Sequence, residues 1–237
     1  MTTKKITTII FDGDDTLWRT QKIYDTIKMK FKVLIESIGV VSEDLIENLD
    51  ELDAKRVELL DFSKARFLES ILLSYAFICS QNNLNWDIQI EKKIRSYVGM
   101  LNNKPQLYGD VMPTLERLKM NYDLILYTSG DIDSQKEKIK SLGSNFNNIF
   151  SNIFIKPKKT TEELAKLVEE INKSIDELVT IGNSFRSDIL PAINLNIKTI
   201  LVPRGTWIYD EVDNKNQNYS VALSIKEAAD LIINGVI

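Results

Sequence analysis

Short apolar runs that alternate with helical segments constrain this chain most, because they select one class of fold. Candidate strands at 124–127, 149–155, 178–181 and 199–202 are separated by candidate helices at 112–119, 134–142, 161–171, 189–195 and 225–233. Continuous apolar strands joined through helices are typical of an α/β fold whose parallel sheet is covered on both faces. The run at 6–11 predicts a further, central strand of this sheet.

A helical insertion is predicted between the first strand and the rest of the sheet. Residues 19–105 contain no convincing strand, and apolar residues recur there at helical spacing in four sets. One of these sets comprises Leu45, Leu49, Leu52 and Leu59. We therefore expect a discontinuous α/β core at 1–18 and 106–237 with a four-helix bundle inserted at 19–105. The polar run at 213–218 predicts a surface loop.

Composition excludes several classes of function. The net charge of −4, with both signs interspersed over 237 residues, argues against a nucleic-acid surface. Cys79 is the only cysteine and there is no histidine, so a disulfide framework, a Ser-His-Asp mechanism and a His-ligated metal centre are excluded. Cys79 lies among apolar residues, which favours a buried thiol. The first apolar run breaks at Asp12, and no segment approaches membrane-spanning length, so we expect a cytoplasmic protein with no membrane partner.

Three carboxylates follow the first predicted strand, in Asp12-Gly13-Asp14-Asp15-Thr16. Crowded like charges repel one another unless a cation, a shared proton or hydrogen-bond donors compensate. Such a group of oxygen ligands suits Mg²⁺. An acidic turn that simply ends an edge strand is the alternative, because Asp and Gly are ordinary turn residues.

Further polar residues follow the other predicted strands, at the sheet edge where ligands bind in open parallel sheets. They are Thr128, Lys159, Asn183 and Asp188. Together with the carboxylates they provide a metal-binding half and an anion-binding half, which suits phosphoryl transfer. Taken singly, each has a structural alternative: Thr128 and Asp188 can cap helices, and Lys159 can belong to a solvated basic loop with Lys156 and Lys158.

This ordered set resembles the haloacid dehalogenase-like (HAD) superfamily of aspartate-nucleophile hydrolases. The stretch 12–16 resembles its first motif, Thr128 its second, Lys159 its third and the stretch 182–188 its fourth. The insertion resembles the type 1 helical cap of that superfamily. The resemblance covers essentially the whole chain and implies a Rossmann-like, doubly wound parallel sheet.

The resemblance also implies roles for individual residues. Asp12 would attack phosphorus and form an aspartyl phosphate, and Asp14 would protonate the leaving oxygen and then activate water. Mg²⁺ would be held by the Asp12 carboxylate, the Asp14 backbone carbonyl and Asp188. Asn183 stands where the commonest family pattern has an acidic residue, and would bind the metal directly or through water.

The remaining implied contacts concern the substrate. Thr128, Lys159 and backbone amides near Asp14 and Ser129 would bind the phosphoryl oxygens. Substrate choice would lie in the cap, where Lys64 and Arg66 are candidate contacts for an anionic substrate; a solvated start of a helix is the alternative for both.

These implications favour a Mg²⁺-dependent phosphatase acting on a small phosphorylated metabolite. Asp14 argues against a haloacid dehalogenase on the same fold, because a halide leaves without a proton. A phosphomutase or phosphotransferase would share the aspartyl phosphate. A phosphorylatable receiver domain would carry its aspartate after a later strand and no bundle after the first, and a non-catalytic HAD-fold protein would not need Asp12, Asp14 and Lys159.

Overall fold

The computed structural model of the chain describes residues 5–60, 62–204, 207 and 218–237. The chain forms two compact units: residues 1–20 with 104–237 make an α/β unit, and residues 21–103 make a helical unit. The predicted surface loop at 213–218 lies outside the described residues apart from Asn218. No described helix combines the length and apolar character needed to cross a bilayer.

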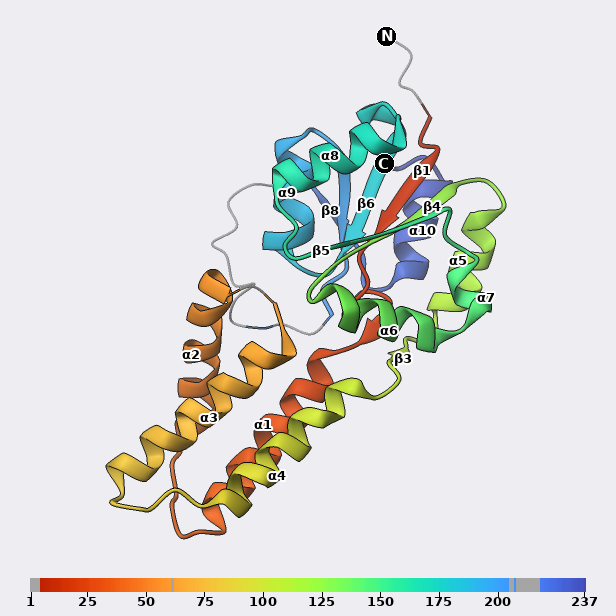
Figure 1. Cartoon of the computed structure of the whole chain (residues 1–237). Coiled ribbons are helices and arrows are strands. Elements are labelled where there is room, and N and C mark those ends of the chain that lie inside the picture. The colour runs from red at the N-terminus through yellow and green to blue at the C-terminus, as the bar shows by residue number, and fades with distance from the viewer. Residues whose placement is uncertain (1–4, 61, 205–206, 208–217) are drawn as a thin grey trace. The chain divides into compact units, whose positions relative to one another are not determined.

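The α/β unit is built on a six-stranded parallel sheet in the order β5-β4-β1-β6-β7-β8 (Figure 1). Its strands are β1 (Thr8–Phe11), β4 (Asp123–Ser129), β5 (Asn152–Lys156), β6 (Leu178–Gly182), β7 (Lys198–Leu201) and β8 (Ser220–Val221). The chain proceeds from β1 through β4 to β5 on one side and from β6 to β8 on the other, so the strand order reverses between β1 and β6. The predicted Rossmann-like, doubly wound parallel sheet is confirmed.

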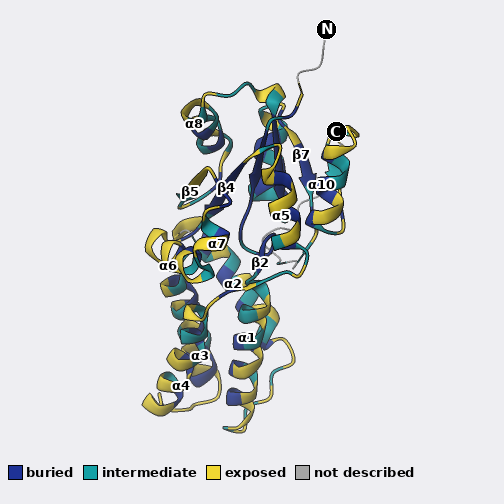
Figure 2. Cartoon of the chain, turned by 90° about the vertical axis from the view of Figure 1, so that its right-hand side faces the viewer, coloured by how far each residue is buried: buried dark blue, intermediate teal, exposed yellow. Residues whose placement is uncertain are grey.

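Helices cover both faces of this sheet. They are α5 (Val111–Lys119), α6 (Ile132–Leu142), α7 (Ser144–Asn147), α8 (Thr161–Ile171), a 3-10 turn η2 (Ile175–Glu177), a π-helical turn η3 (Phe185–Ile189), α9 (Leu190–Asn194) and α10 (Ile225–Ile233). Alternate residues of β1 face opposite layers: Ile9 and Phe11 pack with α5 and α10, and Ile10 packs with α8 and α9. The strands are accordingly buried while the outer sides of the helices are exposed (Figure 2).

Two predicted elements of the α/β unit differ from those observed. The apolar run at 149–155 begins in a turn, because Ile149 and Phe150 pack into the core after α7 and only Asn152–Lys156 pairs with β4. The helix predicted at 189–195 starts earlier, as the π-helical turn η3, in which Leu190 N–H donates to the Phe185 carbonyl. Burial alone explains the apolar residues of the first segment, so apolarity did not identify a strand there.

A small antiparallel ladder within the α/β unit was not predicted. Its strands are β2 (Trp18–Arg19) and β3 (Gln106–Leu107), which flank the helical unit in sequence. Trp18 is fully buried and contacts Phe146 edge to face. Its ring also covers Gly13, where an added Cβ would lie 2.3 Å from the indole. The turn after β1 is therefore closed by close packing of Trp18.

The described residues of the helical unit form four α-helices around one apolar core. They are α1 (Gln21–Glu36), α2 (Leu45–Leu60), α3 (Lys64–Gln81) and α4 (Ile88–Val98), followed by the 3-10 turn η1 (Gly99–Asn102). Ser63 caps α3 by accepting from Arg66 N–H, and Asp87 caps α4 by accepting from Gln89 N–H. Cys79 is buried on α3, as predicted.

The buried face of α2 differs from the predicted apolar stripe. Leu45 and Leu49 are buried, but Leu59 is 82% exposed and the buried face continues through Asp53 and Val57. Asp53 is buried because it pairs with Arg66 of α3. A stripe counted from apolar residues alone cannot detect a buried polar position.

Candidate active site

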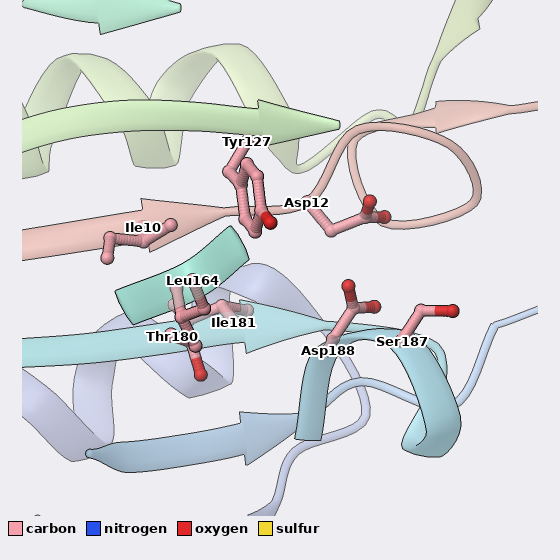
Figure 3. Close-up of a pocket in the computed structure, with 8 residues that line it drawn as sticks. All are labelled: Ile10, Asp12, Tyr127, Leu164, Thr180, Ile181, Ser187 and Asp188. Carbon is pink, nitrogen blue, oxygen red and sulfur yellow. The ribbon is translucent and has the colours of Figure 1, made fainter. Parts of the chain in front are cut away.

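Asp12 occupies the carboxyl end of β1, beside the point where the strand order reverses. Its backbone N–H donates to the Ile181 carbonyl of β6 at 2.9 Å, and its side chain is buried. Asp188 follows β6 on the π-helical turn η3, and the carboxyl groups of Asp12 and Asp188 project into the same space beyond the strand ends (Figure 3). The sheet therefore brings two buried carboxylates together from positions far apart in sequence.

Lys159 bridges these two carboxylates. Its ammonium group donates to Asp12 Oδ1 and to Asp188 Oδ1, and the side chain is 3% exposed. Burial lowers the pKa of Lys159, but the charges of Asp12 and Asp188 outweigh this effect and raise it above its usual value. The neighbouring Lys156 ends β5 and pairs with Glu163 at 3.0 Å instead. Lys159 is thus a firmly protonated cation within the site.

The surroundings of Asp12 disfavour its ionised form, which a further positive charge would stabilise. Burial and the charge of Asp188 raise the pKa of Asp12 to about 7, although Lys159 opposes the shift, and the charge of Asp14 adds to it. Asp12 Oδ2 is buried and has no hydrogen-bond partner among the described residues. A buried carboxylate oxygen without a partner is costly, so a cation bound at this oxygen would stabilise the ionised form.

Asp14 follows Asp12 by two residues, and four donors from the described residues hold its carboxylate. Oδ1 accepts from Trp18 Nε1 at 2.8 Å, from Lys138 Nζ at 2.6 Å and from the Thr20 hydroxyl. Oδ2 accepts from Gln135 Nε2 at 2.6 Å. Burial raises the pKa of Asp14, but Lys138, Thr20 and Gln135 together lower it below its usual value. The Asp14 side chain keeps 24% of its surface exposed, whereas that of Asp12 keeps 8%.

A buried hydroxyl near the end of β4 has no partner among the described residues. Thr128 is fully buried, and its Oγ1 makes no hydrogen bond within the described part of the chain. Ser129 is the last residue of β4, and its carbonyl accepts from Gln135 Nε2 at 2.8 Å. An unpartnered buried hydroxyl is uncommon and suits a ligand that supplies the missing hydrogen bond.

Asn183 is tethered at both ends of its amide group. Its Oδ1 accepts from the Thr16 hydroxyl at 3.3 Å, and its Nδ2 donates to the Arg204 carbonyl at 3.1 Å. Asp188 Oδ2 likewise accepts from Ser184 N–H at 3.0 Å. The described residues contain no group of three or more His, Cys, Asp or Glu side chains arranged around one metal position. Asp12 and Asp188 thus offer two carboxylates at one place (Figure 3), and a metal held there would also need backbone or amide oxygens.

Most of the chain matches one known family of proteins. The model of the haloacid dehalogenase-like hydrolase family matches residues 6–196. The chain belongs to the haloacid dehalogenase-like hydrolase family. The match spans both units and includes all four stretches of the predicted site, so the protein is an enzyme of the hydrolase class.

Solved HAD structures share the fold of this chain. A haloacid dehalogenase-like hydrolase from Xanthomonas campestris matches with a TM-score of 0.78 and 19% identity, over 98% of this chain and 96% of that one. The Bacillus subtilis protein YfnB, bound to magnesium and named as a HAD-hydrolase, matches with a TM-score of 0.64 and 16% identity, over 97% of this chain and 100% of that one. L-2-haloacid dehalogenase from Xanthobacter autotrophicus, with chloropropionic acid covalently bound, matches with a TM-score of 0.67 and 13% identity, over 98% of this chain and 100% of that one.

Phosphatases are also among the similar HAD structures, one of them from Thermococcus onnurineus. No curated protein sequence gives a significant match to the chain. At identities this low, the structural likeness establishes the HAD fold, which hosts both phosphate and halide chemistry.

The two predicted substrate contacts, Lys64 and Arg66, lie in the helical unit of this HAD hydrolase. Arg66 is 4% exposed, and its guanidinium donates to the Asp53 carboxylate and, at 3.2 Å, to the Asp53 carbonyl. It is therefore neither at a solvated helix start nor a free cation, and its charge is already used in a buried ion pair. Lys64 begins α3, and its ammonium donates to the Asn102 side chain of the same unit.

Several residues near the HAD site carry little signal in the sequence. Gln135 and Lys138 of α6 contact Asp14, and their only signal is a spacing of three on a mostly polar helix. The Tyr127 hydroxyl is buried without a partner among the described residues and lines a pocket with Asp12 and Asp188 (Figure 3). Gly182 lies against Asp188, where an added Cβ would come within 2.2 Å of Oδ2.

Proposed function

We propose that this HAD hydrolase is a Mg²⁺-dependent phosphatase that cleaves a small phosphomonoester metabolite through an aspartyl phosphate. The observation that carries the proposal is a second carboxyl group, Asp14, which follows Asp12 by two residues and is held by donors from its own turn and from α6. Phosphate esters leave as poor alkoxides and need a proton donor, whereas halides do not. A buried nucleophile with an adjacent proton carrier therefore favours phosphate esters.

The proposed reaction has two steps. An Asp12 carboxylate oxygen attacks phosphorus while the bond from phosphorus to the ester oxygen breaks. Asp14, which is protonated once the negative charge of the bound phosphate ester raises its lowered pKa, gives its proton to that leaving oxygen. Asp14, now ionised, then takes a proton from water as the water oxygen attacks phosphorus. The bond from phosphorus to Asp12 breaks, inorganic phosphate leaves, and both carboxyl groups return to their starting states.

Three further groups would stabilise the transferring phosphoryl group. The buried Thr128 hydroxyl and the Lys159 ammonium supply hydrogen bonds and positive charge, and the Ser129 backbone belongs to the same strand end. Mg²⁺ would be held by the Asp12 and Asp188 carboxylates and the Asp14 carbonyl, with Asn183 contributing directly or through water, and would neutralise charge on the phosphoryl oxygens. The unpartnered Asp12 Oδ2 supports this assignment.

We further propose that the helical unit, at 21–103, acts as the substrate-selecting cap. Of the two cationic candidates, Lys64 remains available to an anionic substrate, since breaking its contact with the neutral Asn102 leaves no unpaired buried charge. Lys64→Ala should raise KM for the best metabolite while sparing a small aryl phosphate. Unchanged kinetics would remove Lys64 from the proposal.

The single buried Cys79 supports a cytoplasmic site of action.

The decisive experiment is hydrolysis of a panel of phosphorylated metabolites, with Mg²⁺ and with chelator, by the wild type and Asp12→Asn. Haloacids form a parallel arm of the panel. The proposal expects Mg²⁺-dependent release of phosphate by the wild type and none by Asp12→Asn, because an amide cannot form the acyl phosphate. Turnover of haloacids without turnover of any phosphate ester would replace the phosphatase with a dehalogenase, and full turnover by Asp12→Asn would remove the covalent mechanism.

A further inference from the structure

Two side chains of α6 contact the Asp14 carboxylate from a distant part of the chain. Gln135 and Lys138 lie three residues apart on this helix, so they share one face of it. Their contacts cross 121 and 124 residues of sequence, whereas Trp18 and Thr20 reach Asp14 from its own turn. The orientation of the Asp14 carboxyl group is therefore set partly by how α6 packs, and not by the turn alone.

The donors are distributed unequally over the two Asp14 oxygens. From the part of the chain that the structure describes, Oδ1 accepts three hydrogen bonds, from Trp18, Thr20 and Lys138, and Oδ2 accepts one, from Gln135. A carboxylate oxygen offers about two lone-pair sites, so Oδ1 is saturated and Oδ2 keeps one site open. Only Oδ2 can then exchange a proton without breaking an existing contact.

Gln135 connects Asp14 to the end of β4. Its Nε2 donates both to Asp14 Oδ2 and, at 2.8 Å, to the Ser129 carbonyl, while Oε1 has no partner among the described residues. Turning the amide over would place Oε1 against two acceptors, so only this orientation is compatible with its neighbours. Gly130 permits the approach, since its φ is +135° and an added Cβ would lie 3.1 Å from Nε2.

Among the described residues, Lys138 is the only cation that donates to Asp14. Its ammonium lies 2.6 Å from Oδ1, and its side chain is 19% exposed. The terminal torsion of an aspartate side chain is broad, so without fixed partners its two oxygens interchange readily. A charge-assisted hydrogen bond from Lys138 to one oxygen and an amide bond from Gln135 to the other oppose that rotation.

We infer that Lys138 and Gln135 are positioning residues that hold Asp14 with Oδ2 as the oxygen that exchanges the proton with the substrate. The inference rests on the proposed role of Asp14 as the proton carrier. In the first step the proton on Oδ2 passes to the ester oxygen as the bond from that oxygen to phosphorus breaks, and Asp14 is left ionised. In the second step Oδ2 regains a proton from the attacking water.

The test compares substrates that differ only in their need for a proton. The leaving group of an alkyl phosphate is a poor alkoxide, whereas 4-nitrophenyl phosphate releases a stable phenolate. We use kcat/KM, which reports the steps up to transfer of phosphorus to Asp12 and is unaffected by later hydrolysis of the acyl phosphate. The variants are Lys138→Met, Gln135→Met, Lys138→Arg and Asp14→Asn, with Lys136→Met on the exposed side of α6 as the matched control.

Lys138→Met and Gln135→Met should each lower kcat/KM at least about 10-fold for the best alkyl phosphate, and change it less than about 3-fold for 4-nitrophenyl phosphate. A general loss of structure would lower both values together. Lys138→Arg should keep most of the wild-type kcat/KM for the alkyl phosphate because it retains a charged donor. Lys136→Met should have the kcat/KM of the wild type on both substrates. Equal effects of Lys138→Met on both substrates, or none on either, would overturn the inference.

Two further measurements separate this inference from the proposed function. If Asp14→Asn lowers kcat/KM equally for the alkyl phosphate and for 4-nitrophenyl phosphate, Asp14 is not the proton carrier, and the inference is wrong as well. If Asp14→Asn lowers kcat/KM mainly for the alkyl phosphate but Lys138→Met does not, Asp14 is the proton carrier and only the inference about Lys138 and Gln135 is wrong. Crystal structures of Lys138→Met and Gln135→Met provide a readout without activity: an Asp14 carboxyl group unmoved in both variants would contradict the positioning role.

Discussion

Replacing Gly182 by alanine tests how closely β6 must approach Asp188. Gly182 ends β6, and a Cβ at this position would lie 2.2 Å from Asp188 Oδ2, 2.3 Å from its Cγ and 2.4 Å from its Cβ. Ordinary contacts of a Cβ begin near 3.4 Å, so the whole Asp188 side chain has to move by about 1 Å. No rotation of the carboxyl group alone can relieve three contacts that include the Asp188 Cβ.

The displacement should reduce activity more than stability. Asp188 would lose its geometry toward Ser184 N–H and toward Lys159, which also contacts Asp12. A misplacement of about 1 Å in an active site can cost about 100-fold in rate, and overpacking of a core costs about 1–3 kcal/mol. We therefore expect Gly182→Ala to fold, with kcat/KM for the best phosphate ester reduced about 100-fold and the Mg²⁺ concentration for half-maximal activity raised.

The assay pairs kinetics with urea unfolding and uses Gly109→Ala as its control. A Cβ at Gly109 meets no atom within 4 Å, so this variant should keep the activity and stability of the wild type. If Gly182→Ala retained its kcat/KM within about 3-fold and its Mg²⁺ dependence, the placement of Asp188 in the site would be wrong.

Three other predictions follow from buried groups of the two units. The pKa of Asp12 in the folded protein is about 7, which exceeds its ordinary value of 3.8. The contribution of Asp12 to the stability of the metal-free protein is therefore complete below pH 3.8 and is lost as pH rises through 7. Thermal unfolding should show this fall in stability, which should be weaker with Mg²⁺ and absent in Asp12→Asn. Thr128→Val should leave the free energy of unfolding within about 0.5 kcal/mol, because Oγ1 has no hydrogen bond to lose within the described residues, yet should raise KM for phosphate esters. A large loss of stability in urea unfolding would contradict this. Arg66→Met should lower the free energy of unfolding by about 3–5 kcal/mol by stranding Asp53, with KM unchanged; a raised KM at undiminished stability would restore Arg66 as a substrate contact.

Local patterns in the sequence predicted the elements and their type well where one physical signal dominated. The predicted helices at 161–171 and 225–233 agree with α8 and α10, because Thr160 and Ser224 provide side-chain caps just before them. Prediction failed where a residue's burial came from distant partners. Ile149 and Phe150 are apolar because they fill the core after α7, and Asp53 is buried because Arg66 of the next helix neutralises it.

The sequence by itself determined the α/β class, the central strand that ends just before Asp12, and the order of the polar residues that follow the strands. These properties depend on apolar runs and turn residues that are neighbours in the chain. The resemblance singled out Lys159 from Lys156 and Lys158, but only the tertiary structure decided that its ammonium contacts both Asp12 and Asp188. Only the tertiary structure decided that Gln135 and Lys138 hold Asp14. These contacts to Asp12 and Asp14 join residues more than 100 positions apart, and their distances depend on the register of β1 between β4 and β6 and on how α6 packs. No local pattern specifies that packing, because it is the sum of contacts over the whole core.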